Sequence, residues 1–217
     1  MATKKSTELV IPALEIKEVT LRIVGDSPLI SHAWSEKAKL MMLQKQQKKA
    51  TSAKEIRRPA VEFANSLYWL TEKPNLDDLT DKEAQKILSE VIPKSKFGFP
   101  TLAFKAAAID GAFQQKVVDK KTTARGAIHL VGEFAEIEGI PIMREDMGRI
   151  GISTADLRYR AEFKSWSTHL NIKYNSGAIS LEQVVNLFNV GGFSNGVGDW
   201  RPAKDGSFGT FHVDSIG

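Results

Sequence analysis

The chain contains no cysteine and only four histidines in 217 residues. The absence of cysteine excludes disulfides and thiolate zinc sites, and the four histidines lack the spacing of paired metal ligands. Long apolar runs are also missing: the segment around Val19 to Val24 is too short to cross a bilayer, and the N-terminus lacks the apolar core of a signal peptide. We therefore expect a cytoplasmic protein that has no membrane partner, metal or cofactor.

The composition favours one folded domain over residues 1–217, because 42% hydrophobic residues suffice for a substantial core. The net charge is only +4, but residues 35–58 hold eight basic and two acidic residues, a local charge of +6. This segment predicts sequence-independent phosphate contacts. A solvated helix face followed by a linker is the alternative interpretation. The predicted contacts are Lys37, Lys45, Lys48, Lys49, Arg57 and Arg58.

Alternating apolar residues and helical spacings predict the order of elements. A strand carries Val19, Leu21 and Ile23 and ends at Gly25, and a helix follows from Ser35 to about Lys49. Residues 50–97 predict a mainly helical insertion, with one helix carrying Phe63, Leu67 and Leu70 and another beginning at Thr80 or Asp81.

The second half of the chain continues this alternation. After Pro100, Phe104, Ala108, Ile109 and Phe113 recur at helical spacing, and residues 127–139 predict a strand. Residues 157–163 and 168–175 predict a hairpin, and a helix with a capping box at Ser180 and Gln183 ends at glycine before a strand over 207–213. The fold class is therefore α+β: a ferredoxin-like βαββαβ antiparallel sheet with helices on one face and a helical insertion.

A glycine-rich loop over residues 190–207 precedes the last strand. Residues 190–213 contain six of the chain's 16 glycines, around Trp200, Arg201 and Lys204. Glycine permits unusual backbone conformations and close approach, and an aromatic beside cations suits single-stranded nucleic acid. The alternative for the loop is an ordinary surface turn. The alternative for Trp200 is a side chain folded back as a lid over the core.

A second basic set lies between residues 125 and 160. Arg158 and Arg160 share one face of a predicted strand, where they would reach phosphates. Glu145, Asp146 and Asp156 offer the alternative of ordinary ion pairs. The whole set comprises Arg125, Arg144, Arg149, Arg158 and Arg160.

Catalytic residues are sparse. Asp26 and His32 flank the turn after the first strand, and an aspartate with a histidine suits metal-dependent or acid–base cleavage of a phosphodiester. Asp-Ser-Pro is also a routine turn, so the favoured interpretation is a non-catalytic protein, with a ribonuclease as an alternative.

Two segments carry a resemblance to a known family. VTLRIVGDSPL (residues 19–29) and the glycine-rich stretch at 190–213 resemble the RAMP superfamily, RRM-related proteins that form the RNA-gripping backbone of class 1 CRISPR effectors. The resemblance implies an RRM-like protein that assembles along single-stranded RNA or DNA as a homo-oligomer or filament, within a larger ribonucleoprotein. Some relatives place an RNA-cleaving residue near the position of Asp26 and His32. A phage relative acting in a bacterial host cell fits equally, and the alternative is a phage structural or inhibitor-like protein.

Overall fold

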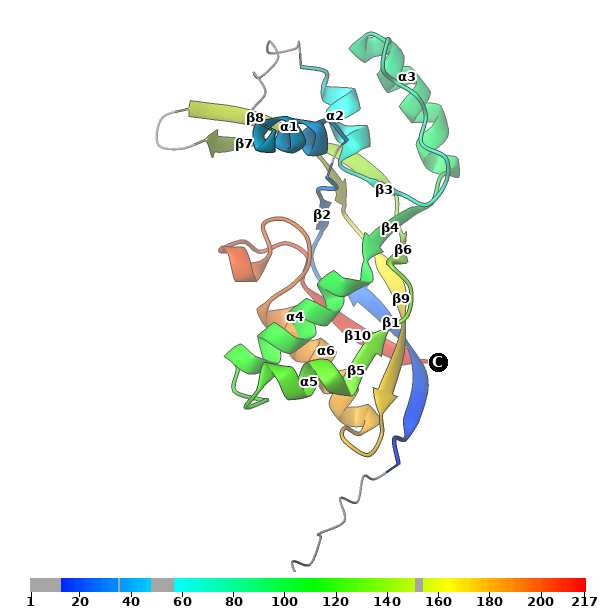
Figure 1. The fold of residues 1–217 in the computed structure, drawn as a ribbon. Coiled ribbons are helices and arrows are strands. Elements are labelled where there is room, and N and C mark those ends of the chain that lie inside the picture. Colours follow the sequence, from blue (N-terminus) through cyan, green and yellow to red (C-terminus); the bar gives the residue numbers. More distant parts are fainter. Residues whose placement is uncertain (1–12, 35, 48–56, 151–153) are drawn as a thin grey trace, which may run out of the picture.

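The computed structural model describes residues 13–34, 36–47, 57–150 and 154–217. Its strands form two antiparallel sheets, and the fold is α+β as predicted (Figure 1). The larger sheet has the order β10-β1-β9-β6-β4-β3, with β5 also paired to β9, and the smaller sheet has the order β2-β8-β7. The strands are β1 (Ile16–Gly25), β2 (Leu29–Ser31), β3 (Tyr68–Trp69), β4 (Phe97–Pro100), β5 (Ile128–Leu130), β6 (Phe134–Glu138), β7 (Pro141–Ile150), β8 (Thr154–Phe163), β9 (Ser167–Asn175) and β10 (Phe211–Ile216).

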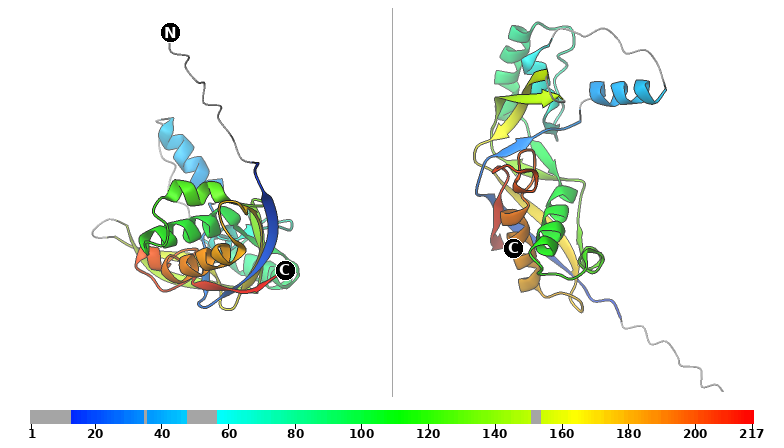
Figure 2. Two further views of the ribbon diagram at one scale, coloured as in Figure 1. Left: turned by 90° about the horizontal axis from the view of Figure 1, so that it is seen from below. Right: turned by 90° about the vertical axis from the view of Figure 1, so that its left-hand side faces the viewer.

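The helices divide between the two sheets. Helices α4, α5 and α6 lie together against the larger sheet, whereas α1, α2 and α3 lie at the end of the molecule that holds β7 and β8 (Figures 1 and 2). The helices are α1 (Glu36–Gln46), α2 (Pro59–Asn65), α3 (Asp81–Val91), α4 (Thr101–Gln114), α5 (Lys121–Ala127) and α6 (Leu181–Ser194), with short 3₁₀ turns η1 (Ile92–Lys94) and η2 (Pro202–Lys204).

The core lies between the larger sheet and α4 and α6. Leu21 of β1 is fully buried opposite Leu170 of β9, as the alternation predicted. Phe104 of α4 lies between Trp166 and Phe211, with ring centroids 6.2 and 5.5 Å away. These aromatic contacts fix α4 against the sheet.

The predicted helix at Ser180 is confirmed, but its end is not where the glycines suggested. The Ser180 and Gln183 capping box is present, and α6 continues through Gly191 and Gly192 to Ser194. A Cβ on Gly191 would lie 2.4 Å from the Cα of Ala108 in α4. Gly191 is therefore needed for close helix packing, and the predicted loop over 190–207 begins only after residue 194.

The predicted hairpin is wrong, although both of its strands exist. β8 pairs with β2 and β7 in the smaller sheet, whereas β9 pairs with β1, β5 and β6 in the larger one. The connection between them contains Trp166, which is buried in the core and donates its Nε1 hydrogen to the Ser27 carbonyl. This buried indole separates the two strands into different sheets.

The remaining elements differ from the predictions in their bounds. The predicted strand over 127–139 is two strands, β5 and β6, both alongside β9. The last strand starts at Phe211, so Phe208 belongs to the loop.

No helix within the described residues is long and apolar enough to cross a membrane.

The segment predicted as an insertion contributes to both sheets: its helix α2 packs on the smaller sheet, and its strand β3 belongs to the larger one. α2 packs against α3 and β8. It ends at Asn65, so Leu67 and Leu70 follow the helix and do not belong to it, and β3 forms between them by pairing with β4. α3 begins where predicted, with a capping box of Thr80 and Glu83. That residues 50–97 form an insertion stays a prediction, and residues 50–56 lie outside the described ranges.

Candidate functional site

The loop from Asn195 to Thr210 lies against the segment that joins β1 to β2. The Asp26 amide donates to the Thr210 carbonyl at 2.9 Å, and the Gly209 amide donates to the Pro28 carbonyl at 2.8 Å. The Asp199 amide donates to the Ile30 carbonyl at 3.0 Å. These bonds hold the loop beside β2, near the smaller sheet (Figure 1).

The backbone at Trp200 adopts a conformation that bulky residues rarely take. Its φ is 55°, in the left-handed region, and its carbonyl accepts a hydrogen bond from the Phe208 amide at 3.0 Å. Gly206 folds against this carbonyl so closely that a Cβ there would lie 1.7 Å from the oxygen. A strained backbone of this kind persists only where its surroundings hold it, and such positions cluster at functional sites.

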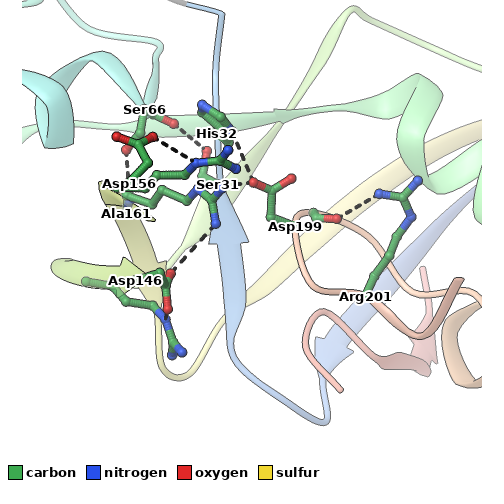
Figure 3. A network of polar contacts seen from close by, with 12 residues as sticks. Ser31, His32, Ser66, Asp146, Asp156, Ala161, Asp199 and Arg201 are labelled. Atoms are coloured by element: carbon green, nitrogen blue, oxygen red, sulfur yellow. Dashed lines mark hydrogen bonds and ion pairs between the residues drawn. The ribbon is translucent and has the colours of Figure 1, made fainter. Parts of the chain in front are cut away.

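Asp199 connects the loop to both β2 and β8. Its carboxylate accepts a hydrogen bond from His32 Nδ1 at 3.0 Å and lies 3.2 Å from Arg160 Nε (Figure 3). Burial alone would raise the pKa of Asp199, but the His32 hydrogen bond and the charges of Arg160 and Arg201 outweigh it and lower that pKa. The Asp199 carboxylate is therefore ionised at neutral pH and binds the loop electrostatically.

The far end of the loop meets the same sheet through Arg144. Its guanidinium lies 4.6 Å from the Phe208 ring centroid, and its Nε donates to Asp146 at 2.8 Å. Ser66 joins β2 to β8 nearby, because its carbonyl accepts from Ser31 and its hydroxyl accepts from the Ala161 amide, both at 2.8 Å (Figure 3). The smaller sheet is thus the support on which the loop rests.

Two tryptophans lie close in sequence to the two residues of the Asp199–His32 bridge. Trp200 follows Asp199 and is 42% exposed, and Trp34 lies two residues after His32 and is 64% exposed. This exposure disagrees with the alternative in which Trp200 folds back as a lid over the core. The tryptophan that is buried in the core is Trp166. We call Trp34 and Trp200, with the loop cations Arg201 and Lys204, the tryptophan surface.

The loop cations differ in their freedom. Arg201 is half-buried and donates from Nη1 to the Gly198 carbonyl at 2.9 Å, so it also supports the loop. Lys204 is exposed at the end of η2. Phe193, at the end of α6, is 82% exposed and precedes the loop directly. Exposed aromatic and cationic side chains therefore occur both within the loop and shortly before it.

The catalytic candidates do not form a joint site. Asp26 accepts from His212 Nδ1 at 2.6 Å, whereas His32 is bonded to Asp199. Within the described ranges, no group of three or more His, Asp or Glu side chains is placed to hold a metal ion. Instead, the Asp26 side chain joins the segment after β1 to β10, and the His32 side chain joins the segment after β2 to the loop.

The basic segment of residues 35–58 is only partly described. Arg57 is bonded to Glu62 and Asp156, and its pKa is raised first by the hydrogen bond to Glu62. Arg58 donates to the carbonyls of Leu76, Asp77 and Leu79. Both arginines therefore have partners within the fold, and their phosphate contacts stay a prediction. Lys37 and Lys45 belong to α1, and Lys48 and Lys49 lie outside the described residues.

The second arginine set is largely neutralised by carboxylates. Arg158 pairs with Asp156 at 3.4 Å, and Arg144 lies between Asp146 and Glu162. The side chain of Arg160 is only 4% exposed, so its predicted phosphate contact is wrong. The ion-pair alternative therefore describes these three arginines. Arg125 is exposed and lies 4.0 Å from Asp110, and Arg149 belongs to β7.

The face of the larger sheet away from α4 and α6 is polar and internally paired. Its contacts join Arg22 to Asp214 at 3.0 Å, Lys173 to Glu18 at 2.8 Å, and Thr20 to Asn171 at 2.9 Å. These side chains satisfy one another and present charge of both signs. This face of the larger sheet is therefore a poor platform for stacking bases.

Comparison with known proteins finds similarity only among solved structures. No protein-family model matches the chain, and no curated protein matches its sequence. The crystal structure of Cmr6 from Pyrococcus furiosus is similar with 13% sequence identity, over 93% of this chain and 100% of that chain, at a TM-score of 0.34. A TM-score of this size assigns neither a fold nor a function to this chain.

Proposed function

We propose that the chain binds single-stranded nucleic acid at the tryptophan surface, without cleaving it. The observation that carries this proposal is the exposed Trp200 on a left-handed backbone that is held against β2. Its neighbour Asp199 bonds to His32, which lies two residues before the exposed Trp34. A stacked base and an aromatic ring attract each other by roughly 1–3 kcal/mol. A backbone held in place in advance lowers the entropy that is lost when a base stacks on the side chain it carries.

The order of elements supports the same proposal. β1, α4, β5, β9, α6 and β10 follow a βαββαβ sequence, and we propose that they form a ferredoxin-like, RRM-like unit related to the RAMP superfamily. In this unit the side chains on the polar sheet face are engaged in ion pairs, so the nucleic acid would bind at the loop from Asn195 to Thr210. RNA and DNA both present the bases and phosphates that this surface would contact.

We propose further that several copies assemble along one strand, within a larger ribonucleoprotein. β7 lies at the edge of the smaller sheet and carries Ile142, Met143 and Met147, which are all exposed. Exposed apolar side chains on an edge strand favour contact with another chain. If the tryptophan surface binds a protein and not a nucleic acid, replacing its tryptophans would leave the affinity for oligonucleotides unchanged.

Salt dependence tests the proposal. Fluorescence anisotropy with labelled U30 and dT30 is expected to show binding that weakens with salt, and a 30-base-pair duplex is expected to bind more weakly. If Arg201 and Lys204 each neutralise one phosphate, log K should fall with log salt with a slope of about −1.4, and Lys204→Gln should reduce that slope by about 0.7.

The matched control is Lys96→Gln, because Lys96 pairs with Glu136 on the larger sheet. This variant should keep the wild-type slope. Absence of binding at low salt, or an equal slope in the Lys204 and Lys96 variants, would contradict the proposed function. Sedimentation on U60 counts the copies, and a single copy would contradict assembly along the strand.

A further inference from the structure

Arg160 is a buried cation at the centre of the support beneath the loop. It lies on β8, its Nε is 3.2 Å from Asp199, and its Nη1 is 3.7 Å from Asp146. A guanidinium this deeply buried is rare unless it is paired. Both contacts have ion-pair distances but lack hydrogen-bond geometry. The buried atoms Nε and Nη1 of Arg160 and Oδ2 of Asp146 are therefore stabilised by charge attraction and not by hydrogen bonds.

The contacts of Arg160 join the two ends of the Trp200 segment. Asp199 immediately precedes Trp200, and Asp146 holds Arg144 over the Phe208 ring. The two positions belong to one loop, because the Phe208 amide donates to the Trp200 carbonyl. A single guanidinium therefore links the β7–β8 strand pair to both sides of the strained residue.

We infer that Arg160 is a positioning residue that sets the place of the Trp200 indole and transmits the position of β7 and β8 to it. Its effect on affinity rests on the proposed function, whereas its effect on the indole does not. The left-handed backbone of Trp200 is unfavourable for a bulky side chain, so it persists because its neighbours hold it. Without Arg160, the Asp199 carboxylate keeps the exposed His32 bond and the charge attraction of Arg201 but loses its buried partner, and the Trp200 backbone relaxes.

The test uses ¹⁹F NMR of the full chain labelled with 5-fluorotryptophan. The chain has four tryptophans, so replacing each by phenylalanine assigns every resonance. Arg160→Met is expected to shift or broaden the Trp200 resonance while the buried Trp166 resonance stays in place. The affinity for dT30 should fall on the order of tenfold. Arg160→Lys keeps the charge without the planar fork, so it should produce a smaller change of the same kind.

The control is Arg22→Met, which removes an arginine–aspartate pair from the larger sheet, away from the loop. It should leave the Trp200 resonance unchanged. The inference is overturned if Trp200 keeps its wild-type resonance in both folded Arg160 variants, or if Trp166 moves as far as Trp200. If the Trp200 resonance moves but the wild-type chain binds no oligonucleotide, the positioning role stands and the proposed function fails.

Discussion

Replacing Trp34 and Trp200 together by alanine is expected to lower affinity for U30 and dT30 by about 2–6 kcal/mol, because each ring would stack on one base at roughly 1–3 kcal/mol. Both side chains are exposed, so the substitutions should leave the thermal unfolding midpoint nearly unchanged. Anisotropy titrations at fixed salt measure the loss, and the single variants show how it divides between the rings.

The control for this pair is Phe113→Ala. Phe113 is an exposed aromatic on α4, packed under Lys121 at 5.0 Å, away from the loop. Its replacement should leave affinity unchanged. If the double tryptophan variant binds as tightly as the wild type, the stacking role of this surface is refuted. If it loses stability along with affinity, the rings serve the fold.

Gly191→Ala is expected to destabilise the fold by roughly 1–3 kcal/mol or more, because overpacking a close contact forces backbone shifts. The added Cβ would lie 2.4 Å from the Cα and 2.5 Å from the nitrogen of Ala108, and backbone atoms in a packed helix cannot yield as a side-chain tip can. A loss of 3 kcal/mol corresponds to a fall in Tm of roughly 6–12 °C for a chain of this size. Thermal unfolding followed by circular dichroism measures it.

Gly126→Ala is the matched control within another helix. A Cβ at Gly126 meets nothing within 4 Å, so the better helix propensity of alanine decides the outcome. Stability should stay equal or rise by up to about 1 kcal/mol. A Gly191→Ala protein that is as stable as the wild type would show that α4 and α6 do not cross at this point.

The elements with strong local signals were predictable. The capping residues of α3 and α6 and the alternation of β1 are encoded within a few neighbouring residues, and the structure contains all of them. The helix after Pro100 also formed, with Phe104, Ala108 and Ile109 buried, whereas Phe113 of the same predicted set is exposed. Local hydrogen bonding and periodic burial decide such elements, so sequence alone suffices.

Pairing between strands depended on contacts far apart in the chain. The sequences of β8 and β9 fit a hairpin. The two strands enter different sheets because Trp166 between them is buried against Phe104 and Phe211, a contact that the local sequence does not reveal. Glycine was ambiguous for the same reason. Gly191 serves a helix crossing and Gly206 serves a tight loop, and composition cannot distinguish these uses.

The candidate site was visible in part. Trp200, Arg201 and Lys204 stood out among the glycines, but Trp34 was missed although it lies two residues after His32. Charge runs suggested phosphate contacts at Arg57 and Arg160, whereas the fold brings carboxylates to both. Sequence shows which charges exist, and only the packing of strands and loops shows which are neutralised.

Ultraviolet cross-linking of the protein to U30 containing 4-thiouridine, followed by mass spectrometry of the peptides, tests whether the strand binds at the tryptophan surface. We expect cross-links to peptides that contain Trp34 and Trp200, reduced by competing unlabelled U30. Specific cross-links confined to the polar sheet face around Arg22, Asn171 and Lys173 would contradict it.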